Sequence, residues 1–164
     1  MTEQPELEMP LELLRAKIKV AFPDAAFSGV ITGADGLLSE ELDEEQALYG
    51  ALRGRKWSEV PVSIIESNPD GIVLLTDEAF VAFLPAWLNR ALTQEKVREM
   101  MVYVFSPDVH KSTETTDHRM RQFTSPQKDV LVAFLKYCLE VESSKFVKER
   151  ARSAVAYASQ FIHQ

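Results

Sequence analysis

Two histidines in the polar stretch 106–123 are the side chains of this chain best suited to acid–base or metal chemistry. His110 and His118 have Asp108 and Asp117 as near neighbours in the sequence. Four nitrogen and oxygen ligands can in principle form a metal site. The eight-residue separation of the two histidines matches no known ligand frame, however. We therefore predict no metal and no cofactor.

Nucleophilic catalysis would need a serine or cysteine beside a base and an orienting group. The single cysteine, Cys138, lies within an apolar helical pattern, which predicts a buried thiol and excludes an internal disulfide framework. The sequence has no G-x-S-x-G, no H-E-x-x-H and no phosphate-binding glycine loop. We therefore predict no catalytic residues. The sequence does not decide whether the protein is an enzyme, but it favours a protein that is not one.

A run of acidic side chains is the other chemically distinct feature. It follows Ser39, a candidate N-cap, at the start of a helix expected over 40–53, where the helix dipole favours negative charge. Such a run is suited to a solvent-exposed face, and it could also be a docking surface for a basic partner. The predicted partner-binding residues are Glu40, Glu41, Asp43, Glu44 and Glu45.

The charge of the chain is unevenly distributed. The net charge is −7, and residues 1–50 contain eleven acidic side chains against three basic ones. An acidic first third argues against nucleic acid or anionic lipid as the partner, because phosphate contacts need clustered Lys and Arg. The sequence shows neither an apolar run long enough to span a membrane nor a signal peptide. We therefore expect a cytoplasmic protein with a basic protein partner.

The element expected at the centre of the fold is an antiparallel β-hairpin. Its strands are predicted at about 72–75 and 80–84, since both runs are short and rich in β-branched or aromatic residues. Residues 76–79 would form the four-residue loop. Pro85 would end the second strand and begin the next helix.

Helices are expected to cover this hairpin, which gives an α+β fold of about six helices in a single domain, 10–164, after a flexible acidic tail, 1–9. The remaining helices are predicted over 10–22, after Pro61, after Thr93, over 125–142 from a Thr124–Gln127 capping box, and after Ser143 or Ser144. Residues 106–122 are expected to be a long loop, either mobile or functional. Trp57 and Trp87 are predicted to be core anchors.

The order of several short motifs resembles a family of small uncharacterised bacterial cytoplasmic proteins. The shared features are W-x-x-[IV]-P at Trp57–Pro61 and F-x-LPA-[YW]-L, which compares with Phe80–Leu88 here, followed by a glutamine-containing cap at Gln127. The resemblance covers about residues 16–160. The family has no assigned activity, so the resemblance implies no catalytic residues.

Two functions remain open from the sequence. The first is a non-enzymatic protein-binding module, an immunity-like inhibitor that masks a basic surface of a partner such as a toxin through its acidic face. The comparison with immunity proteins is an analogy of size and charge. The alternative is a small enzyme or ligand-binding protein with a pocket between the hairpin and 106–122, using His110, His118 or Arg121.

Overall fold

The protein is built from helices, as seen in a computed structural model that describes residues 9–35 and 43–162. Within these ranges the chain forms α1 (Leu11–Ala21), α2 (Asp43–Leu52), η2 (Trp57–Glu59), α3 (Val62–Ser67), η3 (Pro69–Leu74), α4 (Asp77–Ala91), α5 (Glu95–Val104), η4 (Pro107–Val109), α6 (Glu114–Gln122), α7 (Ser125–Val141) and α8 (Lys145–Ser159). These residues form no strand, and an isolated bridge joins Thr32 to Leu75. The fold is all-α, so the α+β prediction is wrong.

The segment predicted as a hairpin is a 3-10 turn followed by a helix. Most of the first expected strand, 72–75, lies in η3, and all of the second, 80–84, lies in α4. The expected loop is the start of α4. The Thr76 hydroxyl accepts a hydrogen bond from the Ala79 amide at 3.2 Å, and Asp77 and Glu78 occupy the first turn, where negative charge is favoured. These residues therefore cap a helix instead of turning a hairpin.

Pro85 lies inside α4 and does not begin a new helix. A proline in a helix interior removes one backbone hydrogen bond and crowds the preceding turn, at a cost of about 3 kcal/mol. Burial offsets this cost: Phe80, Phe83, Trp87 and Leu88 are all fully enclosed, and burying one such side chain contributes about 1.5–3 kcal/mol. Tertiary packing thus maintains a helix that the local sequence disfavours.

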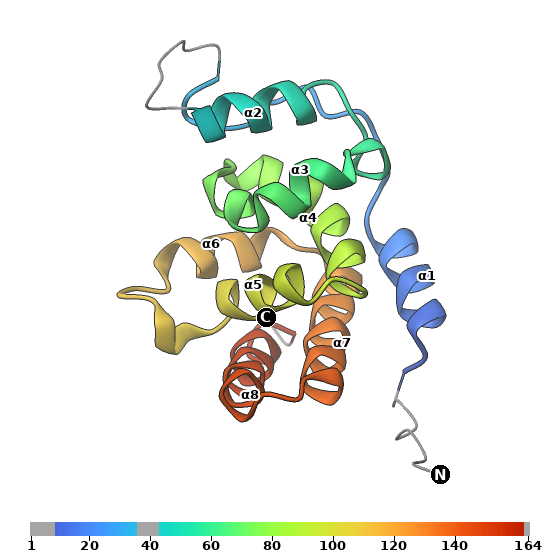
Figure 1. The fold of residues 1–164 in the computed structure, drawn as a ribbon, viewed down its shortest axis with the longest axis vertical. Helices are drawn as coiled ribbons and strands as arrows, with labels where there is room; N and C mark the ends of the chain where they lie inside the picture. Colours follow the sequence, from blue (N-terminus) through green and yellow to red (C-terminus); the bar gives the residue numbers. More distant parts are fainter. Residues whose placement is uncertain (1–8, 36–42, 163–164) are drawn as a thin grey trace.

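Figure 1 shows how the other elements surround α4. α2 lies across one end of the molecule, α8 lies at the other end, and α1 runs along the side beside α7. α4 contacts α1, α3, α5 and α6 as well as η2 and η3. Both tryptophans anchor this core, as predicted. The Trp57 and Trp87 ring nitrogens donate to the carbonyls of Phe22 and Pro69, each at 3.2 Å.

The stretch predicted as a long loop, 106–122, contains η4 and α6, so that prediction is also wrong. The polar sequence concealed a helix that buries Met120 on one side, with Phe123 buried directly after its end. A polar helix of nine residues would be marginal by itself in water. Its stability depends on the contacts that α6 makes with the rest of the protein.

Several local predictions are confirmed. Thr124 and Gln127 form the expected capping box, with hydrogen bonds of 3.0 and 3.3 Å. Ser144 caps α8 and Cys138 is buried. Gly54, which follows α2, has a positive φ of 70°. Burial raises the pKa of the Cys138 thiol well above its ordinary value, which makes this side chain a poor nucleophile.

Other predictions fall on residues outside the described ranges. These are the Ser39 cap, the first residues of the acidic run, and the tail except Met9. Among the described residues, no helix combines the length and the apolar character needed to cross a bilayer.

Removing the Thr76 hydroxyl tests whether this residue caps a helix or lies in a hairpin loop. We expect Thr76→Ala to lower the free energy of unfolding by about 1–2 kcal/mol, because a helix loses its cap together with a 2.6 Å hydrogen bond from Thr76 to the Val30 carbonyl. Thr76→Ser, which retains the hydroxyl, is the matched control. Urea denaturation measures both, and equal stability of Thr76→Ala and wild type would contradict the assignment.

Candidate functional site

The described part of the acidic run lies in the first turn of α2, as predicted. It consists of Asp43, Glu44 and Glu45, whereas Glu40 and Glu41 lie outside the described residues. The Glu44 carboxyl lies close to that of Asp70 in η3. Burial, followed by the neighbouring Asp70, raises the pKa of the Glu44 carboxyl above its ordinary value. The run is therefore continued in space by an acid from another part of the chain.

Asp70, which lies close to Glu44 of α2, also lines a groove beside α5. This groove of about 430 Å³ is lined by Pro69, Asp70, Lys96, Glu99, Met100 and Tyr103. Glu99 and Tyr103 also line a second, more apolar groove of about 210 Å³ with Val102, Val109, Phe146, Val147 and Arg150. Because the two grooves share residues, they form one continuous surface.

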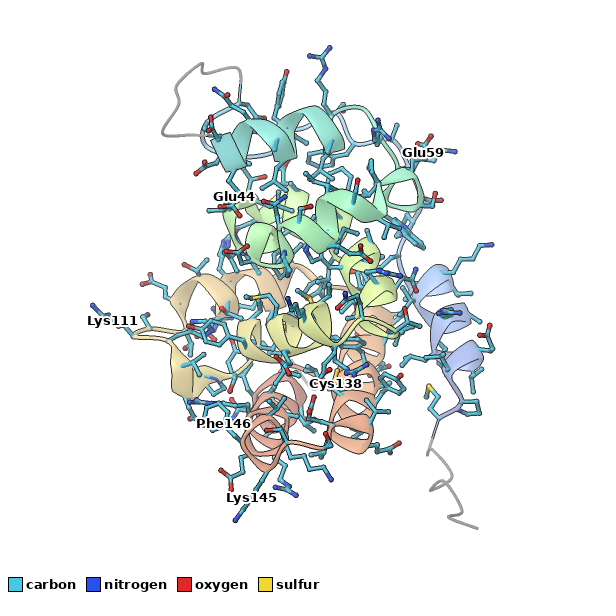
Figure 2. All side chains as sticks on the ribbon, viewed as in Figure 1. Glu44, Glu59, Lys111, Cys138, Lys145 and Phe146 are labelled. Atoms are coloured by element: carbon cyan, nitrogen blue, oxygen red, sulfur yellow. The ribbon has the colours of Figure 1, made fainter. Side chains whose placement is uncertain are left out.

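Two aromatic side chains are exposed on this surface. Phe146 is 64% exposed and Tyr103 is 47% exposed, and the Arg150 guanidinium lies 4.9 Å from the centre of the Phe146 ring. In Figure 2, Phe146 lies near the start of α8, while Glu44, in the first turn of α2, lies at the other side of α5. Exposed aromatic rings beside charged groups are a common composition of protein-binding surfaces.

We call this surface the acidic–aromatic face. It is defined by its acidic members and by the apolar, aromatic and basic side chains between them: Asp43, Glu44, Glu45, Asp70, Lys96, Glu99, Met100, Tyr103, Phe146 and Arg150. Acids outnumber bases within it. The sequence identified its α2 part; the α5 and α8 parts were missed because no charge run or motif marks them.

His110, a residue of the predicted alternative pocket, binds the last carbonyl groups of α5. Its Nε2 lies 3.1 Å from the carbonyl oxygen of Tyr103 and 3.2 Å from that of Val104. Since a carbonyl can only accept, Nε2 is the protonated nitrogen in this arrangement. The imidazole ring also packs edge-on against the Tyr103 ring, with the two ring centres 5.4 Å apart. His110 thus satisfies carbonyls at a helix end, where cationic or donor side chains are favourable.

His118 and the neighbouring Arg119 join α6 to the start of α4 through Asp77. His118 Nδ1 lies 2.7 Å from Asp77 Oδ2, and Arg119 Nε donates to Asp77 Oδ1 at 2.9 Å. Arg119 is 8% exposed, donates to the Leu75 carbonyl at 2.6 Å, and lies 4.5 Å above the Phe80 ring. Sequence reasoning missed this arginine. The spacing of Met120 and Phe123 was the available sign of a buried helix face.

The residues proposed for a pocket do not converge. His110 is bonded to the end of α5, His118 to Asp77, and Arg121 is exposed on α6. The two aspartates near these histidines in the sequence also have other partners. Asp108 accepts a hydrogen bond from Ser153 at 2.7 Å, and Asp117 accepts one from Tyr157. The two histidines and the two aspartates thus join neighbouring segments of the fold.

Within the described ranges, one group of His, Cys, Asp and Glu side chains is close enough to bind a metal ion. It consists of Glu95, Glu99 and Glu142, and the sequence analysis did not identify it. Glu142 lies 43 positions after Glu99, so only the packing of α5 against α7 brings them together.

Comparison with known proteins gives one match. A family model described as a family of unknown function (DUF6714) matches residues 12–160. No curated protein and no solved structure matches the chain.

The Asp77–Arg119 ion pair predicts a pH-dependent stability. The hydrogen bond from Arg119, assisted by His118 and opposed by burial, lowers the pKa of Asp77 below its ordinary value of 3.8. A lowered pKa means that the stabilisation is complete above the unfolded pKa and is lost as the pH falls through the folded pKa. We expect Asp77→Asn to reduce the free energy of unfolding by about 2 kcal/mol at pH 7, with the difference shrinking below about pH 4.

Urea denaturation of both proteins between pH 7 and pH 3 measures this effect. Glu78→Gln, which changes the next acid in the same helix turn, is the control and should leave the stability nearly unchanged. A difference between wild type and Asp77→Asn that is the same at all pH values would contradict the ion-pair role.

Proposed function

This chain belongs to the DUF6714 family, whose function is unknown, and we propose that it is a non-enzymatic protein-binding module that masks a basic surface of a partner protein. The observation that supports the proposal is the acidic–aromatic face, where acids from α2, η3 and α5 adjoin two exposed aromatic rings. The occupant that fits is a protein surface with Lys and Arg clustered around an apolar side chain.

The charged and the aromatic side chains of the face have different roles in binding. The acids at one side of the face attract a basic partner over a distance, speed its association and disfavour acidic competitors. Phe146 and Tyr103, which are partly exposed before binding, supply apolar area and ring contacts once the partner has docked. Large aromatic side chains are among the residues that contribute most to binding energy in interfaces.

An immunity-like inhibitor is the specific form of this function that we propose. Such a protein would neutralise a toxin by covering its basic surface, and a bacterial cytoplasm would be its place of action. The support is the acidic first third of the chain and the absence of a catalytic motif from the sequence. The pocket alternative has no comparable support, because His110, His118 and Arg121 have separate environments.

Charge reversal on the face tests the proposal. Proteins encoded beside the gene are expressed, and their binding to the purified chain is measured by calorimetry. We expect a basic neighbour to bind at micromolar concentration or tighter, and Glu44→Lys combined with Asp70→Lys to weaken binding on the order of tenfold or more. Binding should also weaken as salt is raised from low to physiological concentration.

The matched controls separate local charge from global charge. Glu114→Lys together with Glu12→Lys alters the net charge by the same amount at exposed positions of α6 and α1 and should bind like wild type. Phe146→Ala leaves the charge unchanged and should also weaken binding about tenfold. If no neighbour binds, or if both double variants bind as wild type does, this function is excluded.

A further inference from the structure

Glu142 has a buried carboxylate oxygen without a partner. This residue follows α7 as its C-cap and is 4% exposed. Its Oε1 accepts hydrogen bonds from the amides of Ser143 and Ser144, each at 3.1 Å. Its Oε2 is enclosed and forms no hydrogen bond. Buried charged oxygens in folded proteins are nearly always paired, so an exception calls for an explanation such as an ion.

The surroundings of Glu142 contain two further carboxylates. Glu95 and Glu99 lie one helical turn apart on α5 and therefore on the same side of that helix. One carboxylate oxygen from each of the three glutamates lies within 4.8 Å of the others. Glu95 in the first turn of α5 is favoured by the helix dipole, but the dipole does not explain why Glu142 is buried beside it.

The protein's own cations do not neutralise this group by direct pairing. The ion pairs formed among the described residues do not include any of the three glutamates. Arg98 is near enough to lower the pKa of Glu99, yet burial, followed by Glu142 and Glu95, raises that pKa overall. Arg98 Nη1 instead donates to the Ala91 carbonyl at 3.4 Å. Like charges are thus brought together without a bonded counter-charge.

We propose that Glu95, Glu99 and Glu142 bind a divalent metal ion, and that the ion is Ca²⁺. Carboxylate oxygens are ligands for hard cations. Ca²⁺ accepts six to eight oxygen ligands in a flexible geometry, whereas Mg²⁺ demands near-ideal octahedral geometry and gives up its water ligands reluctantly. Three carboxylates that come from the ends of two different helices therefore suit Ca²⁺ better than Mg²⁺.

The bound ion would join the start of α5 to the end of α7 and pair the free oxygen of Glu142. Water molecules would complete the coordination shell, as they commonly do at calcium sites. This site is distinct from the docking proposal in its chemistry. Glu99 belongs to both, so the test of the metal site uses the other two glutamates.

Calorimetric titration of the full-length chain with CaCl₂, after removal of metals with EDTA and dialysis, tests the proposal. We expect one Ca²⁺ per chain, a higher melting temperature with Ca²⁺, and weaker binding of MgCl₂. Glu142→Gln retains the size of the side chain and an acceptor for Ser143 and Ser144, and it should weaken Ca²⁺ binding at least tenfold. Without metal, the same variant should melt at or above the wild-type temperature, because repulsion among the three carboxylates is relieved.

A second variant and a control distinguish a specific loss of Ca²⁺ binding from misfolding of Glu142→Gln. Glu95→Gln alters an exposed member of the group and should also weaken Ca²⁺ binding at least tenfold, while the exposed Glu114→Gln on α6 should bind like wild type. The proposal is overturned if millimolar CaCl₂ produces neither heat nor a melting shift. Equal affinity of wild type and both site variants overturns it as well, and tighter binding of Mg²⁺ overturns the assignment to calcium.

Discussion

Burial of α4 on nearly every side is the constraint on which the rest of the structure depends. Its aromatic and aliphatic side chains project in all directions, and only a surrounding layer of other helices can shield them from water. α1, α3, α5 and α6 all contact it. The same enclosure explains how Pro85 is accommodated and why the Trp87 N–H needs a protein acceptor, which Pro69 supplies.

The polar groups that first suggested chemistry serve mainly to connect this layer. His118 and Arg119 bind Asp77 and attach α6 to α4, Asp117 bonds to Tyr157 of α8, and His110 satisfies carbonyls at the end of α5. A side chain engaged in this way is held in one orientation by several partners. The binding sites that we propose therefore lie elsewhere, on the acidic–aromatic face and at the glutamates between α5 and α7.

The layout of charge in space differs from its layout along the chain. All of the net negative charge belongs to residues 1–50, while the rest of the chain is nearly neutral. Nevertheless, Asp70 and Glu99 from that nearly neutral part line one groove, because η3 packs on α5. Charge counting could identify the α2 end of this surface. It could not identify the contribution of α5, where Glu95 and Glu99 are interspersed with Lys96 and Arg98 in the sequence.

The sequence by itself determined the features that depend on neighbouring residues. The capping box of Thr124 and Gln127, the end of α2 at Gly54, and the burial of Trp57 and Cys138 all follow from local backbone chemistry or strong hydrophobicity. Tertiary structure decided the rest. An apolar run such as Val81–Leu88 suits a strand or a buried helix equally well, and packing on all sides selected the helix. Likewise, α6 depends on Arg119, and the group around Glu142 exists only because α7 ends beside α5. These outcomes rest on contacts between distant residues, which no local pattern encodes.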